Sequence, residues 1–193
     1  MTISSFVCSL LAVIWNRGGL HNQSCPEALC TEFTQAQAKT HIRREGKDVT
    51  LISNSYMTLE AIHAANHLAE MGIDAEILDL TQLTETDWPL LYNSVNKTGH
   101  CVIADIGHKS FGIGAEISAR LMENCFSALK AAPVRLGLPD YPEPTSFGLT
   151  KDYYNDANSI AQAVAALFGK TAKAVKQKTT PHDVPGDWFT GPF

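Results

Sequence analysis

Short apolar runs alternate with longer stretches of helical periodicity from Lys39 onward. Runs rich in Val, Ile and Leu that end in Gly, Asn, Ser or Asp are typical of buried strands. We therefore predict strands at 41–45, 49–53, 75–80, 101–104 and 133–136.

Four helices are predicted between and after these strands. The first covers about 57–71, with Gly72 as its C-cap glycine. Its apolar stripe consists of Leu59, Ile62, Ala65 and Ala69, with Ala61 and Leu68 beside it. The second helix begins at Thr84 or Thr86 and runs to about Val95.

The third predicted helix follows Gly112 and Gly114, and the fourth closes at Gly169. The third has one apolar face, formed by Ile117, Leu121, Cys125 and Ala128. The fourth carries Ile160, Val164, Leu167 and Phe168. Before it, Pro139, Pro142 and Pro144 force an irregular stretch.

Strands that alternate with helices form βαβ units, because parallel strands need such a crossover. The pattern predicts an α/β fold, and right-handed crossovers make it a three-layer α/β/α sandwich. We expect this domain to cover 36–169, after an irregular extension at 1–35. Residues 170–193, with four lysines and three prolines, are expected to be a tail that is disordered or docks Trp188 and Phe189 on a partner.

The apolar run 6–15 is too short to span a bilayer and follows no basic residue. A packing segment or a poorly ordered end is favoured over a cleaved targeting segment, and no membrane partner is expected. Five cysteines, an odd number at irregular spacing, favour a reducing compartment: Cys8, Cys25, Cys30, Cys101 and Cys125. Of these, Cys101 and Cys125 lie in apolar segments and are expected to be core residues.

The net charge of −5 argues against a nucleic-acid partner, which requires a basic surface. Metal sites have weak support. His63 and His67 have the spacing of a zinc-protease pair, but Ala64 stands where that motif needs glutamate. The grouping of His21, Cys25 and Cys30 fits no usual zinc pattern.

The glycine turn 110–116 lacks the third glycine of a dinucleotide fingerprint, because residue 117 is Ile. A tight turn is therefore favoured over a phosphate site. His108 and Lys109 follow the strand at 101–104, at the sheet edge where α/β folds bind ligands. A solvated loop is the alternative. No nucleophile elbow is present.

Four motifs in order carry a family resemblance: 44–53 (REGKDVTLIS), 59–80 with its helix and GIDAEILDL strand, 107–117 (GHKSFGIGAEI), and 137–146 with Tyr153–Tyr154. Over about 36–169 the chain resembles the transketolase C-terminal domain. Within that family it is similar to the beta subunit of the decarboxylase component of pyruvate, branched-chain 2-oxo acid and acetoin dehydrogenase complexes.

The resemblance implies a mixed five-stranded sheet whose first strand, 41–45, is antiparallel. It implies a role in subunit association, with an alpha subunit, other beta-type chains and the dihydrolipoyl acyltransferase core as partners and a homodimer as an open alternative. A regulatory ligand site has been suggested in this domain for transketolase relatives. The implied location is the cytoplasm, or the mitochondrial matrix in a eukaryote.

Two departures bear on catalysis. The residues before 36 are too few for the family's pyrimidine-binding domain, and no Gly-Asp-Gly motif marks a diphosphate-binding domain. Thiamine diphosphate and Mg²⁺ are therefore expected in the parent assembly and not on this chain alone. In addition, Phe111 stands where the family usually has glycine, which is expected to narrow the loop.

The sequence favours an association domain of a split or truncated dehydrogenase beta subunit, without catalytic, cofactor-binding or metal-binding residues of its own. The alternatives are a stand-alone module that binds a small anion and a non-functional fragment. Candidate ligand or interface residues are Asn54, His108, Lys109, Gly112 and Gly114. The expected structural turn contains Asp140, Pro142 and Pro144.

Overall fold

The computed structural model describes residues 40–145 and 153–172, which belong to one unit spanning 39–177. Several expectations lie outside the described residues. They concern the extension at 1–35 with its apolar run, the grouping of His21 with Cys25 and Cys30, Cys8, and the tail beyond 172 with Trp188 and Phe189.

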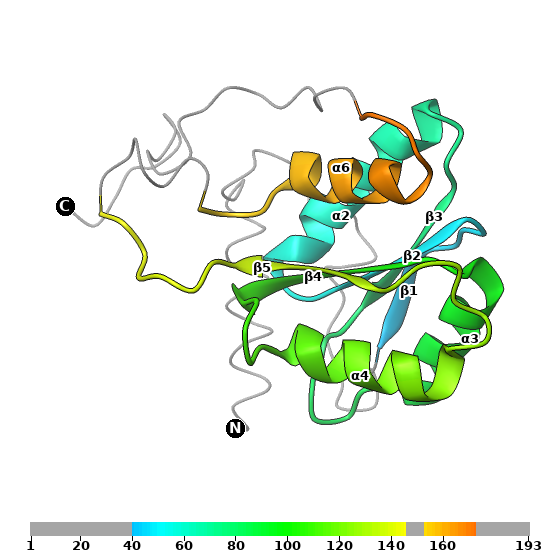
Figure 1. Cartoon of the computed structure of the whole chain (residues 1–193), viewed down its shortest axis with the longest axis horizontal. Helices are drawn as coiled ribbons and strands as arrows, with labels where there is room; N and C mark the ends of the chain where they lie inside the picture. The colour runs from blue at the N-terminus through cyan, green and yellow to red at the C-terminus, as the bar shows by residue number, and fades with distance from the viewer. Residues whose placement is uncertain (1–39, 146–152, 173–193) are drawn as a thin grey trace, which may run out of the picture. The chain divides into compact units, whose positions relative to one another are not determined.

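Five strands form one mixed sheet in the order β1-β3-β2-β4-β5 (Figure 1). Strand β1 (His41–Arg44) runs antiparallel to β3 (Ala75–Asp79). Strands β2 (Val49–Ser53), β4 (Cys101–His108) and β5 (Val134–Leu138) are parallel to their neighbours. The predicted α/β class, the five strands and the antiparallel first strand are confirmed.

Helices cover both faces of this sheet (Figure 1). On one face lie α2 (Tyr56–Glu70) and α6 (Ala157–Leu167), which share one apolar cluster with the sheet. On the other face lie α3 (Trp88–Thr98) and α4 (Ile113–Cys125), which share a second cluster. The three-layer arrangement is therefore confirmed.

The buried face of α2 differs from the predicted stripe. Leu59 and Ile62 are only half-buried and Ala69 is exposed. The buried positions are Met57, Thr58, Glu60, Ala61, Ala64, Ala65 and Leu68. Small side chains dominate this face because α2 packs against both the sheet and the alanine-rich α6. A stripe predicted from the large apolar residues therefore lies to one side of the face that is buried.

Two predicted boundaries also move. Helix α3 begins after Asp87, whose side chain accepts the N–H of Leu90 at 3.1 Å, and not at Thr84 or Thr86. The Thr86 hydroxyl instead donates to the carbonyl of Leu83. Strand β4 runs to His108 rather than ending at 104, because its pairing with β5 resumes beyond a register shift.

Glu60 of α2 is 2% exposed, and its carboxylate accepts the N–H of Ala157 at 2.7 Å. This contact satisfies a backbone donor at the start of α6, whose first turn also carries a capping box between Asp156 and Ser159. The pKa of Tyr56 is raised, mainly by burial and secondly by the adjacent Glu60 carboxylate. Helix α6 is thus fixed to α2 by a buried acid as well as by apolar contact.

A second buried acid, Glu76, lies in β3 and pairs with Lys97 of α3. Its carboxylate also accepts the N–H of Gly46 at 3.3 Å. Burial alone would raise the pKa of Glu76, but hydrogen bonds from Lys97, Ser94 and Gly46 outweigh it and lower the pKa. The folded domain therefore favours the ionised form of Glu76.

Cys101 and Cys125 are buried in the apolar cluster beneath α3 and α4, and neither forms a disulfide. Burial raises the pKa of both thiols. Their prediction as core residues is confirmed.

Candidate functional site

The carboxyl ends of β2 and β4 form the point where the strand order changes direction. From β2 the chain moves to β3 on one side, and after crossing back it continues from β4 to β5 on the other. Helices α2 and α4, which follow β2 and β4, cover opposite faces (Figure 1). Open α/β sheets commonly bind ligands at such a point.

Two loops meet at this edge through polar contacts. Asn54, which follows β2, donates from Nδ2 to Oδ1 of Asp105 in β4 at 3.1 Å. The same Asp105 oxygen accepts the N–H of Gly107 at 3.1 Å. Asp105 is 8% exposed, so this carboxylate joins the loops from inside the domain.

The loop between β4 and α4 requires unusual backbone geometry. Phe111 has φ 58°, in the left-handed region that favours glycine, and its phenyl ring is fully exposed. The ring therefore points into solvent. At Gly112, the N-cap of α4, a Cβ atom would lie 2.2 Å from the carbonyl oxygen of His108. Only glycine fits there without a backbone shift.

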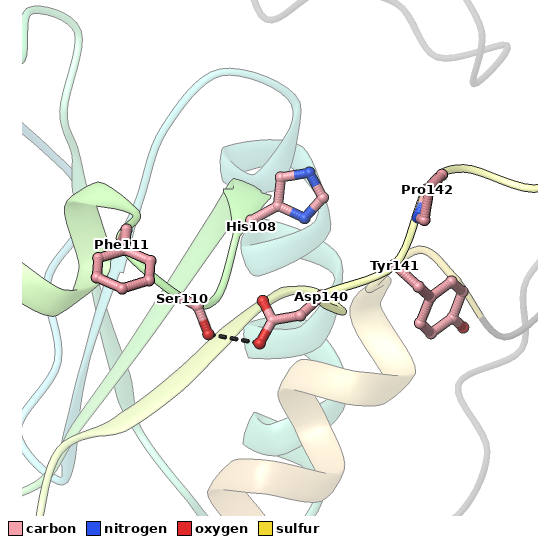
Figure 2. Close-up of a pocket in the computed structure, with 6 residues that line it drawn as sticks. All are labelled: His108, Ser110, Phe111, Asp140, Tyr141 and Pro142. Atoms are coloured by element: carbon pink, nitrogen blue, oxygen red, sulfur yellow. Dashed lines mark hydrogen bonds between the residues drawn. The ribbon is translucent and has the colours of Figure 1, made fainter.

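A shallow, open depression of about 560 Å³ lies between this loop and the segment after β5. Figure 2 shows its six lining residues, which are His108, Ser110, Phe111, Asp140, Tyr141 and Pro142. The Ser110 hydroxyl donates to Asp140 at 2.6 Å, and Nδ1 of His108 lies 2.9 Å from the carbonyl oxygen of Pro139. These contacts connect the two walls.

The residues singled out from the sequence separate into three groups. His108, Asp140 and Pro142 line the depression, whereas Asn54 and Gly112 lie against Asp105 and are not part of the lining. The remaining three lie elsewhere. Lys109 is exposed, and its backbone forms hydrogen bonds with Leu138 and Arg135. Gly114 belongs to α4 and faces Ile103, and Pro144 is not part of the lining.

Sequence reasoning missed Asp105, Ser110 and Tyr141 as members of this region. A charged residue inside an apolar run was the available signal for Asp105. Ser110 and Tyr141 carry no such signal, because each depends on a segment about 30 residues away.

The chemistry of the depression does not suit an anion or a cofactor diphosphate. Its wall carries the Asp140 carboxylate, which would repel both. Within 40–145 and 153–172, no group of three or more His, Cys, Asp or Glu residues could hold a metal ion. His63 and His67 are half-buried on α2, where His67 lies 3.7 Å from Glu70. Neither the depression nor the other described residues fit thiamine diphosphate with Mg²⁺.

The described helices include none that is long and apolar enough to cross a membrane.

The surface at the carboxyl edge of the sheet is aromatic and partly apolar, with Ile106, Phe111 and Tyr141 all exposed. Exposed aromatic side chains around an open depression are typical of protein interfaces.

Comparison with known proteins agrees with this fold. The family model described as "Transketolase, C-terminal domain" matches residues 38–180. The beta subunit of the pyruvate dehydrogenase E1 component from Rhizobium meliloti is 34% identical, over 78% of this chain and 33% of the relative. The mitochondrial beta-1 subunit from Arabidopsis thaliana is 38% identical, over 68% and 37% respectively.

A solved structure described as "Split gene transketolase, inactive beta4 tetramer" superposes with a TM-score of 0.62 at 28% identity. The superposition covers 78% of this chain and 48% of the solved one. The chain therefore spans between a third and a half of the length of these relatives. On the family match and the shared fold together, the chain belongs to the transketolase C-terminal domain family.

Proposed function

We propose that this chain is the association domain of a thiamine-diphosphate-dependent 2-oxo acid dehydrogenase of the beta-subunit type, and that it contributes to assembly rather than to catalysis. The similarity to two pyruvate dehydrogenase beta subunits supports the enzyme class. The described residues hold no arrangement suited to the cofactor, which supports a role in assembly.

The observation that carries this proposal is the exposed rim of the depression. Phe111 is fully exposed on a backbone conformation that disfavours phenylalanine. The backbone strain destabilises an isolated domain, and the exposed ring contributes no burial energy there. Burial of the ring against another chain offsets the strain. Tyr141 and Pro142 on the opposite wall extend the surface that another chain would cover.

A second copy of this chain is the partner that we propose for the first test. The solved relative is described as a beta4 tetramer, so a chain that contains a similar domain associates with copies of itself. Lys109, which precedes the lining residue Ser110, and Asp140, which follows β5, are both exposed. In a two-fold interface, each Lys109 can face the Asp140 of the other copy, which makes the surface self-complementary.

The wider assembly is proposed from the relatives. It contains an alpha-type chain, beta-type chains and the acyltransferase core, with thiamine diphosphate and Mg²⁺ bound by those other parts. The proposed location is the cytoplasm, or the mitochondrial matrix in a eukaryote; the Arabidopsis relative is described as mitochondrial. The small-anion alternative loses support because of the Asp140 carboxylate in the depression.

Sedimentation equilibrium of the full chain tests the proposal. We expect a concentration-dependent dimer or tetramer, and Phe111→Asn should raise the dissociation constant about thirtyfold or more, because truncation of an aromatic anchor at an interface hot spot costs about 2 kcal/mol or more. Asparagine tolerates the left-handed backbone, so the fold should persist. Phe126→Asn is the matched control, because Phe126 is exposed at the other end of α4. A monomer at every soluble concentration, or equal effects of the two variants, would contradict the proposal.

A further inference from the structure

The loops that meet at the carboxyl edge of the sheet are connected by one side-chain hydrogen bond. Asn54 donates to Asp105 across 51 positions of sequence, and Asp105 accepts the Gly107 N–H through the same oxygen. Asn54 directly precedes Ser55, the N-cap of α2, whereas Asp105 opens the segment that leads through Phe111 to α4. A change at Asn54 therefore acts on a loop that it does not belong to.

Backbone strain is concentrated at the two ends of this connection. Within 40–145 and 153–172, Ser55 and Phe111 are the non-glycine residues with positive φ, at 48° and 58°. Ser55 is adjacent to Asn54, and Phe111 is adjacent to Gly112, whose missing Cβ would lie 3.4 Å from Oδ2 of Asp105. Such conformations persist only where the surrounding contacts hold them in place.

The connection is not arranged for maximal stability. Oδ1 of Asn54 is buried and, among the described residues, has no hydrogen-bond partner. A buried acceptor without a donor destabilises the folded domain. Removal of the whole Asn54 amide therefore removes a favourable contact and an unfavourable one together, and the two effects largely cancel.

We propose that Asn54 and Asp105 are positioning residues that hold the segment 105–112 in the shape that presents Phe111 to a second copy of the chain. This inference rests on the association function proposed above. The hydrogen bond fixes the loop before the partner arrives, so less conformational entropy is lost on association. Asn54 acts through the loop and does not itself line the depression.

Asn54→Ala in the full chain tests the inference. We expect a melting temperature within about 3 °C of the original chain, because the two effects on stability cancel. We expect the dissociation constant of self-association to rise about threefold to tenfold, as for one weakened hydrogen bond. Amide hydrogen exchange of the segment 105–112 in the unassociated chain should accelerate. Asn66→Ala is the control, because Asn66 is an exposed asparagine on α2 that accepts from Arg44.

The outcomes separate the two proposals. If Phe111→Asn weakens association and Asn54→Ala does not, the positioning role is overturned while the association function stands. If neither changes association, both proposals are overturned. Should Asn54→Ala fail to fold, Asn54→Ser replaces it, because the shorter side chain remains polar but does not reach Asp105. A loss of association that only follows a loss of melting temperature would indicate a purely structural role and overturn the inference.

Discussion

Replacement of Glu60 should reveal how strongly the buried acid fixes α6 to α2. The Glu60 side chain is 2% exposed and accepts the Ala157 N–H at 2.7 Å. Leucine has a similar volume but no acceptor, so Glu60→Leu leaves that N–H buried and unpaired. A buried donor without a hydrogen-bond acceptor lowers the free energy of unfolding by about 1–3 kcal/mol. Relief of carboxylate desolvation offsets part of the loss, which leaves about 2 kcal/mol of net destabilisation.

The conservative variant Glu60→Gln divides this cost into two parts. Its amide oxygen can still accept from Ala157, whereas the interaction between the charge and the helix N-terminus is lost. That interaction is worth about 0.3–1 kcal/mol. Tyr56→Phe provides a further control, since it removes the phenolic hydroxyl beside Glu60 and leaves the contact with Ala157 intact.

Thermal and urea denaturation followed by circular dichroism measure these effects. With a shift of about 3 °C per kcal/mol for a chain of this size, Glu60→Leu should melt about 6 °C lower and Glu60→Gln about 1–3 °C lower. Native helicity should persist at low temperature, because Asp156 and Ser159 still cap α6. A Glu60→Leu chain as stable as the original would refute the assignment of Glu60 as the anchor of α6.

Three further outcomes are expected. Gly112→Ala should destabilise the chain by about 2 kcal/mol, because its Cβ would lie 2.2 Å from a backbone oxygen, and a melting temperature unchanged from the original would contradict this. The pKa of Glu76 lies below its ordinary value of 4.5, so its stabilising effect is present above that pH and is lost as pH falls below it. Glu76→Gln should therefore flatten the loss of stability below about pH 4.5 in urea titrations, and parallel pH curves would exclude this role. Maleimide labelling with peptide mapping should modify Cys101 and Cys125 only after unfolding, and fast labelling of the native chain would contradict their burial.

The order of elements was predictable because local signals agree with the tertiary structure. Gly72 and Gly169 both have positive φ beyond helix ends, as their positions after apolar periodicity predicted. The buried residues Ile117, Leu121 and Cys125 of α4 were also predicted from spacing alone. The antiparallel β1 came from the family resemblance, because strand direction depends on contacts that periodicity does not contain.

The buried polar residues were not predictable in the same way. Glu60 looks like a solvent-facing position on a helix, yet its partner is a backbone N–H 97 positions later. The small alanines that bury it are weak apolar signals, so a stripe weighted by side-chain size places Glu60 outside the core. The approach of α6 places the N–H of Ala157 against this position.

Topology explains why the candidate site was only partly visible. The polar residues that follow β2 and those that end β4 are distant in sequence, and they meet because β3 and its crossover leave β2 and β4 as neighbours. Once that strand order is known, Asn54 after β2 is expected beside Asp105 in β4, and the hydrogen bond between them becomes a prediction. The exposed Phe111 has no comparable signal, because an apolar residue before Gly112 is equally consistent with a buried loop. Under the association function proposed above, its exposure is the feature that separates an association surface from an ordinary turn, and for that reason Phe111→Asn addresses the proposed function more directly than any core substitution.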